Sequence, residues 1–281
     1  MQICKTLEEL KSQIQFYKAN RRSIGFVPTM GALHDGHLSL CKAAKNENDV
    51  LIVSIFVNPI QFTQENDLIH YPRTEENDIR LLSSIDCDLL FMPTVEVMYP
   101  IKQDIIVGFG ILEQQLEGKY RPGHFNGVGI VVSKLFHLVQ PDKAYFGQKD
   151  LQQFLIIRKL VEQLNFPVQL VCCPIARDLD GLALSSRNAR IKEEHRAEAS
   201  LIYQSLLYAA ELIKGNSLTE IKKAVMKYFA PTTSLQLEYF EIVDSRTLLP
   251  VSELSLPNEL AICVACTLGQ VRLIDNMLIK I

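Results

Sequence analysis

Phe26–Leu40 reads Phe-Val-Pro-Thr-Met-Gly-Ala-Leu-His-Asp-Gly-His-Leu-Ser-Leu, and this stretch decides the fold that we predict. An apolar run ends at Pro28, a short segment with Gly31 follows, and His34-Asp-Gly-His37 opens a periodic segment that continues to Lys45. A strand, a glycine-bearing turn and a helix start, in that order, can present backbone N–H groups to a phosphate. We therefore predict one strand–turn–helix unit of an α/β fold, with an anion site where the helix starts.

Two histidines mark that helix start. His34 and His37 are three positions apart, so both side chains can face one side of the first helical turn. There they can donate to phosphate oxygens and stabilise negative charge that develops during a reaction. They could also form a surface pair or half of a metal site, although no further His follows nearby. The Gly-x-x-x-x-Gly-Lys-Ser/Thr pattern of a P-loop is absent from the sequence.

Length and composition indicate a globular protein with two lobes. The 281 residues are 48% hydrophobic and 22% charged, which is enough for a substantial core. A net charge of −3 gives no general attraction for nucleic acid, and no apolar stretch approaches the roughly 20 residues of a membrane helix. Residues 1–10 lack a basic region followed by an apolar run, so we expect no secretory signal, no membrane or nucleic-acid partner, and a cytoplasmic location.

Cysteine usage agrees with that expectation. The seven cysteines are an odd number and lie mostly in apolar runs, which favours reduced, buried thiols over a disulfide framework. Cys263 and Cys266 have C-x-x-C spacing, but in a strand residues three apart point to opposite faces. We interpret them as core residues.

Strands and helices alternate through the first part of the chain, which predicts a Rossmann-like, doubly wound parallel sheet. The expected strands are 23–27, 50–57, 89–92, 144–146 and 168–173, with an extended piece at 104–108, and the expected helices are 6–18, 75–84, 127–139 and 151–164. From about Ala176 the pattern changes to helices 192–214 and 219–229 and strands 236–244, 259–268 and 271–275. We therefore expect two domains, 1–175 and a smaller α+β domain at 176–281, the latter with a hairpin at Gly269-Gln270.

Two polar segments have the groups that bind anions. Phe146-Gly-Gln-Lys-Asp150 follows a strand and opens a helix, so Lys149 could place its charge on a phosphate. Taken alone, this segment is more often a helix cap with a solvated lysine. Ser185, Ser186 and Arg187 place two hydroxyls and a guanidinium side by side, either as an anion clamp or as an ST-turn before the next helix.

Neutral amides follow other strands and suit a hydroxylated acid, because an amide can donate to a carboxylate and accept from a hydroxyl. Asn58, Gln61 and the pair Gln152-Gln153 are the candidates. Arg121-Pro-Gly-His-Phe125 is either a loop on the substrate side or a turn, and the residues alone do not decide between them.

His-x-Gly-His after a strand resembles the HxGH nucleotidyltransferase superfamily, which includes the class I aminoacyl-tRNA synthetases. A more specific resemblance, over nearly the whole chain, is to the pantothenate synthetase family. It is carried by seven motifs in the family's order: Pro28–His37, Val53-Ser-Ile-Phe-Val-Asn-Pro59, Tyr71-Pro-Arg-Thr74, Arg121–Phe125, Lys149-Asp-Leu-Gln-Gln153, Asp180-Gly-Leu-Ala-Leu-Ser-Ser-Arg-Asn188 and Arg272-Leu-Ile-Asp-Asn276.

The resemblance implies a ligase that joins (R)-pantoate to β-alanine through a pantoyl adenylate, releasing AMP and diphosphate, in pantothenate and coenzyme A biosynthesis. It also implies a Rossmann-like domain (1–175) that binds ATP and pantoate, a C-terminal lid (176–281), Mg²⁺ accompanying ATP, and a homodimer. No residue is marked as a Mg²⁺ ligand or as the base for β-alanine.

Family roles transfer to matching positions of this chain. The implied ATP contacts are Met30, Gly31, Ala32, Leu33, His34, Asp35, Gly36, His37, Gly147, Gln148, Lys149, Asp150, Ala176, Leu184, Ser185, Ser186 and Arg187. The implied contacts to pantoate or β-alanine are Gln61 and Gln153, to which the amide argument adds Asn58. The implied catalytic residues are His37, His34, Lys149, Ser186 and Arg187. Gln148 departs from a position that is often acidic in the family.

Three alternatives stay open at this point. A nucleotidyltransferase that stops at an adenylated product would share the His-x-Gly-His site. A relative of the aminoacyl-tRNA synthetases would share it too, although no basic RNA-binding extension is apparent. A non-catalytic module would bind the nucleotide without turnover.

Overall fold

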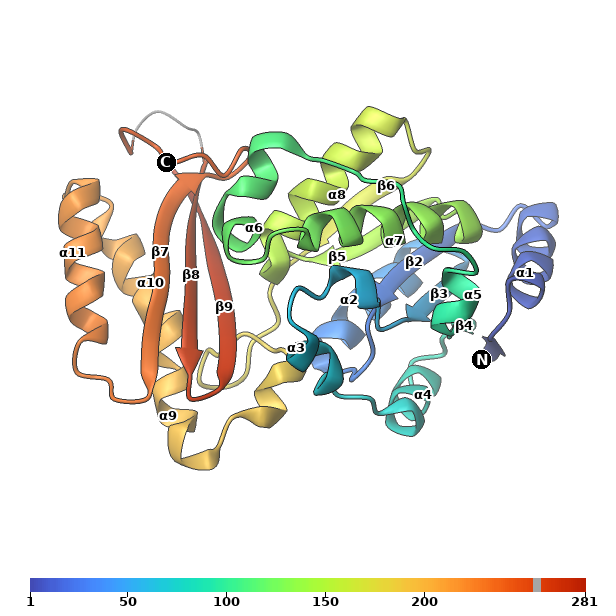
Figure 1. Cartoon of the computed structure of the whole chain (residues 1–281), viewed down its shortest axis with the longest axis horizontal. Helices are drawn as coiled ribbons and strands as arrows, with labels where there is room; N and C mark the ends of the chain where they lie inside the picture. The colour runs from blue at the N-terminus through green and yellow to red at the C-terminus, as the bar shows by residue number, and fades with distance from the viewer. Residues whose placement is uncertain (255–258) are drawn as a thin grey trace. The chain divides into compact units, whose positions relative to one another are not determined.

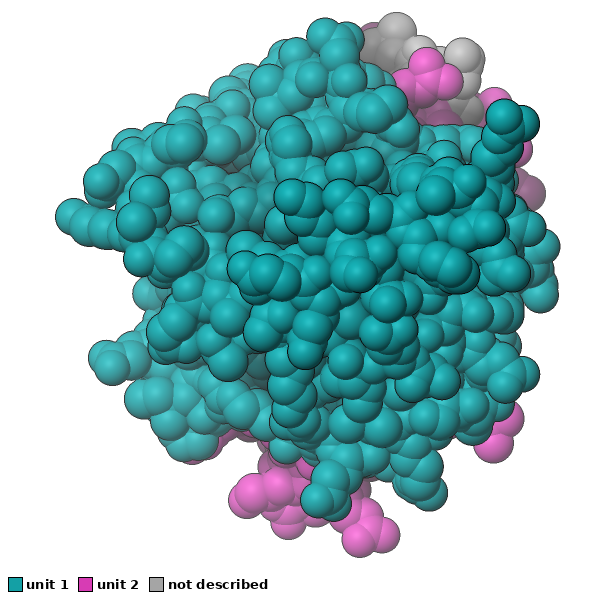
Figure 2. Space-filling model, turned by 90° about the vertical axis from the view of Figure 1, so that its right-hand side faces the viewer, with its two compact units in different colours: residues 1–148, 153–174 teal, residues 149–152, 175–281 magenta. Residues whose placement is uncertain are grey.

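The computed structural model describes residues 1–254 and 259–281 and divides the chain into two compact units. Unit 1 comprises Met1–Gln148 and Gln153–Pro174, and unit 2 comprises Lys149–Gln152 and Ile175–Ile281. Figure 2 colours the two units separately. The short segment Lys149–Gln152 therefore belongs to unit 2 although the chain on either side of it belongs to unit 1.

Unit 1 is built on a six-stranded sheet with the strand order β1-β4-β3-β2-β5-β6 (Figure 1). All five neighbouring pairs are parallel. The strands are β1 (Gln2–Cys4), β2 (Ile24–Thr29), β3 (Val50–Ile55), β4 (Leu89–Phe91), β5 (Lys143–Gly147) and β6 (Gln169–Cys173). The predicted doubly wound, Rossmann-like fold is confirmed.

Helices connect these strands. They are α1 (Leu7–Ala19), α2 (Asp35–Glu47), α3 (Glu65–Ile69), α4 (Glu75–Ser83), α5 (Val95–Met98), α6 (Leu116–Tyr120), α7 (His124–Val139) and α8 (Leu151–Leu164), with 3₁₀ turns η1 (Pro59–Gln61), η2 (Gly110–Gln114) and η3 (Gln148–Asp150). The predicted start of the first helix is confirmed, because Thr6 and Glu9 form a capping box.

The core of unit 1 explains the long apolar runs in its sequence. Phe26 and Val27 of β2 are adjacent and both fully buried, and adjacent residues in a strand point to opposite faces. Both faces of the sheet are therefore covered, as a parallel sheet requires. On one face, Cys41 and Ala44 of α2 pack in a cluster with Val53 and other buried residues of the sheet.

Unit 2 contains an antiparallel sheet, β7-β8-β9, with two helices packed along it (Figure 1). Its elements are η4 (Ser186–Arg190), η5 (Glu193–His195), α9 (Arg196–Ala199), α10 (Leu201–Leu212), α11 (Leu218–Phe229), β7 (Leu235–Asp244), β8 (Glu259–Leu268) and β9 (Val271–Lys280). The predicted small α+β architecture and the hairpin at Gly269 are confirmed. Cys263 and Cys266 are buried free thiols of β8, as predicted.

One prediction of local structure was wrong, and β1 was not predicted. The helix expected at 192–214 is divided into η5, α9 and α10, and Ser200 lies between the last two with its hydroxyl donating to the Ala197 carbonyl at 2.8 Å. Such a side-chain bond competes with the helical pattern. The segment 104–108 is not a strand, and its Ile105 and Ile106 are exposed. The unpredicted strand β1 is only three residues long and gains its partner from β4.

The helices of the described part of the chain include none that combines the length and the apolar character needed to cross a membrane.

Candidate active site

The strand order of unit 1 indicates where a ligand would bind. From β2 the connections run to β3 on one side, whereas β5 lies on the other side, so the winding direction reverses between β2 and β5. Open α/β sheets bind ligands beyond the carboxyl ends of the strands at such a switch point. The segment Met30–His37 follows β2, and Gly147 and Gln148 lie at the end of β5. The predicted unit 1 contacts to ATP are therefore placed at the two strand ends that flank the switch point.

The loop that follows β2 is held in one shape by a carboxylate from α4. Asp78 is buried and accepts the N–H of Ala32 at 2.9 Å and that of Leu33 at 2.8 Å. The Thr74 hydroxyl donates to the same carboxylate at 2.9 Å. The chain turns here through positive φ at Gly31 (82°) and Ala32 (49°). A side chain at Gly31 would in addition come within 3.1 Å of the Asp78 carboxylate.

His34 and His37 lie side by side at the start of α2. Their ring centroids are 4.1 Å apart, and the rings are tilted by 41°. His34 is the N-cap of the helix, and its Nδ1 accepts the Gly36 N–H at 3.1 Å. Because Nδ1 is the acceptor, the neutral ring carries its proton on Nε2. The predicted pair is thus present, with a donor at Nε2 of His34.

Four backbone N–H groups of the loop after β2 donate within the protein. From the sequence we expected backbone N–H groups of this loop to face a phosphate, and these four have acceptors within the protein instead. Gly31 donates to the Thr29 hydroxyl at 3.2 Å, Ala32 and Leu33 donate to Asp78, and Gly36 donates to His34. The physical reason is that a buried carboxylate, a hydroxyl and an imidazole lie within reach of the turn.

Two of the predicted substrate amides, Asn58 and Gln61, form a connected group in unit 1. Gln61 lies at the end of η1, with its Nε2 3.0 Å from the Met30 sulfur. Asn58 donates from Nδ2 to Gln61 Oε1 at 3.0 Å, and the Tyr99 hydroxyl donates to Asn58 Oδ1 at 2.8 Å. Burial raises the pKa of Tyr99, so this hydroxyl remains a donor at neutral pH. Three predicted residues, Met30, Asn58 and Gln61, are therefore brought together.

Residues at the start of α7 contact both Asn58 and Gln61. His124 Nδ1 lies 2.8 Å from the Gln61 carbonyl oxygen, and Asn58 Nδ2 donates to the Gly127 carbonyl at 3.2 Å. A Cβ atom at Gly127 would lie 2.5 Å from the Ile60 carbonyl oxygen, so only glycine permits this approach. The motif Arg121–Phe125 thus spans the turn between α6 and α7 and the start of α7, and its His124 contacts the backbone of Gln61.

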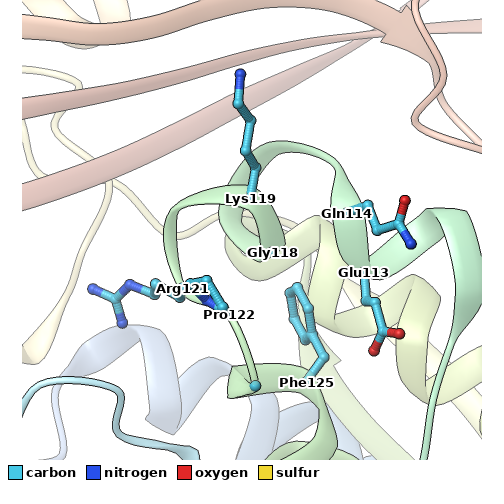
Figure 3. A pocket seen from close by; sticks show the side chains of 8 residues that line it. Glu113, Gln114, Gly118, Lys119, Arg121, Pro122 and Phe125 are labelled. Atoms are coloured by element: carbon cyan, nitrogen blue, oxygen red, sulfur yellow. The ribbon is translucent and has the colours of Figure 1, made fainter.

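A cavity of about 330 Å³ lies beside that turn (Figure 3). It is lined by Glu113, Gln114, Gly118, Lys119, Arg121, Pro122, Gly123 and Phe125. Figure 3 shows Arg121 on the side of the pocket opposite Glu113 and Gln114. Arg121 Nη1 lies 3.9 Å from an Asp67 oxygen, and its Nε lies 3.8 Å from a Glu117 oxygen. The guanidinium therefore has carboxylate neighbours on two elements.

Unit 2 contains the other predicted ATP contacts. Lys149 lies in η3 at the start of α8, and its Nζ is 4.0 Å from an oxygen of Asp150. Gln153 lies in the first turn of α8 and belongs to unit 1. The Lys149 carbonyl accepts a hydrogen bond from Asn276 of β9 at 3.0 Å.

The loop before η4 brings together the remaining predicted contacts. The Leu184 N–H donates to the Ala176 carbonyl at 2.9 Å. Ser185 is the N-cap of η4, and its Oγ accepts the Arg187 N–H at 3.3 Å. Asn188 donates from Nδ2 to the Ala183 carbonyl at 3.0 Å. The local serine cap that the sequence offered as the alternative is therefore present. Anion binding by Ser185, Ser186 and Arg187 stays a prediction.

Metal-ligating side chains do not cluster in this protein as far as residues 1–254 and 259–281 show. No group of three His, Cys, Asp or Glu residues there could hold an ion. Mg²⁺ in phosphate chemistry is usually held by substrate phosphates, waters and one or two carboxylates.

Comparison with known proteins gives the family. A model of the family described as pantoate-beta-alanine ligase matches residues 2–278. The chain belongs to the pantoate-beta-alanine ligase family. It is 46% identical over 276 residues to pantothenate synthetase of Cytophaga hutchinsonii, with 98% of each chain covered. It is 48% identical over 280 residues to pantothenate synthetase of Thermosipho africanus, covering 99% of this chain and 100% of the relative. The predicted family and the ligase class are confirmed.

Solved structures of the family share the fold. Pantothenate synthetase of Thermus thermophilus superposes with a TM-score of 0.92 at 43% identity, with 99% of each chain covered. Pantoate-beta-alanine ligase of Francisella tularensis, in a complex with beta-gamma ATP and beta-alanine, gives a TM-score of 0.81 at 36% identity. That alignment covers 99% of this chain and 97% of the Francisella chain.

Two residues that support the site, Asp78 and Asn276, were not predicted from the sequence to do so. Asp78 stands four positions after Thr74, the end of a motif that was noticed, but an acid in the first turn of a helix is usually explained by the helix dipole. Asn276 ends another noticed motif, and its partner Lys149 lies 127 positions away. The motifs were the available signal, but spacing alone did not show what these side chains contact.

Proposed function

We propose that this member of the family condenses (R)-pantoate with β-alanine, using ATP and forming a pantoyl adenylate, and that it releases AMP and diphosphate. The observation that carries the proposal is the His34–His37 pair at the start of α2, beyond the end of β2. The Francisella relative, described as complexed with beta-gamma ATP and beta-alanine, supports ATP and β-alanine as substrates.

In the proposed first step, a pantoate carboxylate oxygen attacks the α-phosphorus, a new P–O bond forms, and the bond to diphosphate breaks. Negative charge grows on phosphate oxygens during this step. His34 would donate from Nε2, and His37, Lys149, Ser186 and Arg187 would supply further donors or positive charge. Since four amides of the β2 loop donate within the protein, we assign most of this stabilisation to side chains. Mg²⁺ would arrive with ATP and offset the charge of the leaving diphosphate.

Pantoate would bind at the connected amides. Gln61, held by Met30 and Asn58, offers both a donor and an acceptor to a hydroxylated acid, and Gln153 would offer a second amide. In the second step, the neutral amine of β-alanine attacks the acyl carbon, the amide bond forms, and AMP leaves. The acyl adenylate is prone to hydrolysis, so water must be kept away from it. We propose that residues 176–281 serve as the lid.

We propose further that the enzyme is a cytoplasmic homodimer. Seven free cysteines support a reducing compartment. The dimer rests on the family resemblance and is tested by sedimentation equilibrium, in which a mass near 32 kDa at micromolar concentration would exclude it.

The experiment that tests the function is an assay of AMP formation with ATP, pantoate and β-alanine, in which each component is omitted in turn. Stoichiometric AMP should form only when all three are present, and omission of β-alanine should leave diphosphate release limited to about one equivalent per enzyme. Continued turnover without β-alanine would favour a nucleotidyltransferase. Binding of ATP without any turnover would favour a non-catalytic module.

A further inference from the structure

Two polar side chains at the end of the Arg272–Asn276 motif are buried in unit 2. Asp275 and Asn276 of β9 are each 3% exposed. Buried polar groups are costly unless they are hydrogen-bonded, so their partners show what they stabilise.

Asn276 holds the main chain of a predicted catalytic residue. Its Nδ2 donates to the carbonyl oxygen of Lys149 at 3.0 Å. Lys149–Gln152 is the segment that belongs to unit 2 although the residues on either side belong to unit 1. The Asn276 amide is therefore a direct link between β9 and this segment.

Asp275, the preceding residue, holds the loop that leads to Arg187. The Arg177 guanidinium donates to its two oxygens at 2.6 and 3.0 Å, in a bidentate pair. Arg177 also donates to the Gly181 carbonyl at 3.0 Å and stacks on the Tyr203 ring at 3.9 Å from its centroid. Burial raises the pKa of Asp275, and Arg177 opposes that rise.

The two bonds come from neighbouring residues of one strand. Arg177 directly follows Ala176, whose carbonyl accepts the Leu184 N–H just before Ser185. The Lys149 segment is thus fixed to Asn276, and the segment 176–187 is fixed to Asp275, the preceding residue of β9. Misplacement of a reacting group by about 1 Å can cost about 100-fold in rate.

We propose that Asn276 is a positioning residue for adenylation: its amide fixes the main chain of Lys149, and the Asp275–Arg177 pair fixes the loop of Ser185–Arg187 to the same strand. This inference rests on the proposed function of Lys149. It adds that β9 fixes the positions of Lys149 and of the Ser185–Arg187 loop relative to each other. Asn276 would affect the rate of adenylation through these positions and not through contact with the substrate.

The test compares Asn276→Ala with a matched control, Asn216→Ala. Asn216 also donates from Nδ2 to a backbone carbonyl, that of Leu212, at 3.0 Å in unit 2. Pantoate-dependent diphosphate release is measured with saturating substrates and as a function of ATP. Asn276→Ala should lower kcat by about 10-fold or more, and the KM for ATP should change less, because the displaced lysine acts on charge that develops during the reaction. Asn216→Ala should keep wild-type values.

A double-mutant cycle separates positioning from general destabilisation. Lys149→Ala removes the ammonium group but keeps the carbonyl, so Asn276→Ala added to it should cause almost no further loss of kcat. A full additional loss in the double variant would overturn the inference. Circular dichroism and thermal unfolding of each variant show whether it is folded, and Asn276→Ser, which is too short to reach the carbonyl, replaces Asn276→Ala if that variant does not fold.

The outcomes also distinguish this inference from the proposed function. If Lys149→Ala is as active as the wild type, the proposed role of Lys149 is wrong. If Lys149→Ala is impaired while Asn276→Ala and Asn276→Ser are not, only the positioning role of Asn276 is wrong.

Discussion

At the scale of single residues, buried polar side chains set the shape of the site. Asp78 is the clearest case, because one carboxylate accepts two loop N–H groups and a hydroxyl. His34 acts in the same way within its own turn, where an accepted N–H determines which ring nitrogen carries the proton. The groups that would contact ligands are thus oriented by bonds made before any ligand arrives.

Asp78→Asn should distort the loop without changing the size of the side chain. The amide NH₂ would face a backbone N–H that now donates to an oxygen, leaving one donor without an acceptor. We expect about 1–3 kcal/mol of lost stability in urea unfolding, together with a raised KM for ATP and a lowered kcat. Asp104→Asn, an exposed acid in unit 1, is the control and should change neither quantity. Wild-type kinetics in Asp78→Asn would show that the loop keeps its shape without this carboxylate.

His37→Ala should lose adenylation while pantoate affinity changes little. Removal of one donor to developing charge typically costs about 10²–10³ in rate. Pantoate-dependent diphosphate release is the measurement, and His137→Ala, in the last turn of α7, is the control. Release at the wild-type rate in His37→Ala would remove His37 from its proposed role.

Tyr145 predicts a pH dependence of stability. The side chain is fully buried, its hydroxyl donates to Glu47 at 3.0 Å and accepts from Asn48 at 2.8 Å, and burial raises its pKa to about 12. Unfolding therefore releases a proton between pH 10 and about 12, so stability is complete below pH 10 and falls as the pH rises. This one group contributes at most about 1.4 kcal/mol per pH unit. In urea unfolding, the difference in the free energy of unfolding between the wild type and Tyr145→Phe should decrease over that pH interval. A constant difference would contradict the raised pKa of Tyr145.

At the scale of elements, local patterns predicted most of the fold. The apolar run of β3 and the start of α1 depend on neighbouring residues, and both were predicted correctly. β1 was missed because its identity depends on β4, more than 80 residues away. The site divides in the same way. Residues close in the sequence, such as His34 and His37, could be paired from their spacing. The hydrogen bonds of Asp78 and Asn276 join segments that are distant in the sequence, which no local pattern shows.

Gly127→Ala should separate α7 from η1. The added methyl group would meet backbone atoms of Ile60 and Gln61 at 2.5–2.7 Å, and backbone cannot yield as a flexible side chain does. We expect the free energy of unfolding to fall by about 1–3 kcal/mol. The KM for pantoate should rise, because Gln61 is displaced. Gly215→Ala is the control, since nothing lies within 4 Å of the added atom. An unchanged KM for pantoate in folded Gly127→Ala would show that Gln61 does not depend on this packing.

At the scale of the whole molecule, the described residues form two units with separate hydrophobic clusters. Leu51 is fully buried in a cluster of unit 1, and Leu206 is fully buried in the cluster of unit 2. Chains with more than one such unit need not unfold in a single step.

Leu51→Ala and Leu206→Ala should therefore weaken different parts of the chain. Each substitution leaves a cavity and should lower the free energy of unfolding by about 2–5 kcal/mol, but only for the unit that contains the substituted leucine. Hydrogen exchange followed by mass spectrometry should show faster exchange in β2 and β3 for the first variant and in β7 and β8 for the second. Equal acceleration in all these strands for either variant would mean that the units unfold together.

The membership of Lys149–Gln152 in unit 2 limits how this protein can be recombined with its relatives. A chimaera spliced once, near residue 175, would join the lysine segment of one parent to the β9 strand of the other. Such a chimaera would keep every motif but would pair the Asn276 amide of one parent with the Lys149 carbonyl of the other. An exchange of unit 2 as a whole includes these four residues, because unit 2 is discontinuous in the sequence.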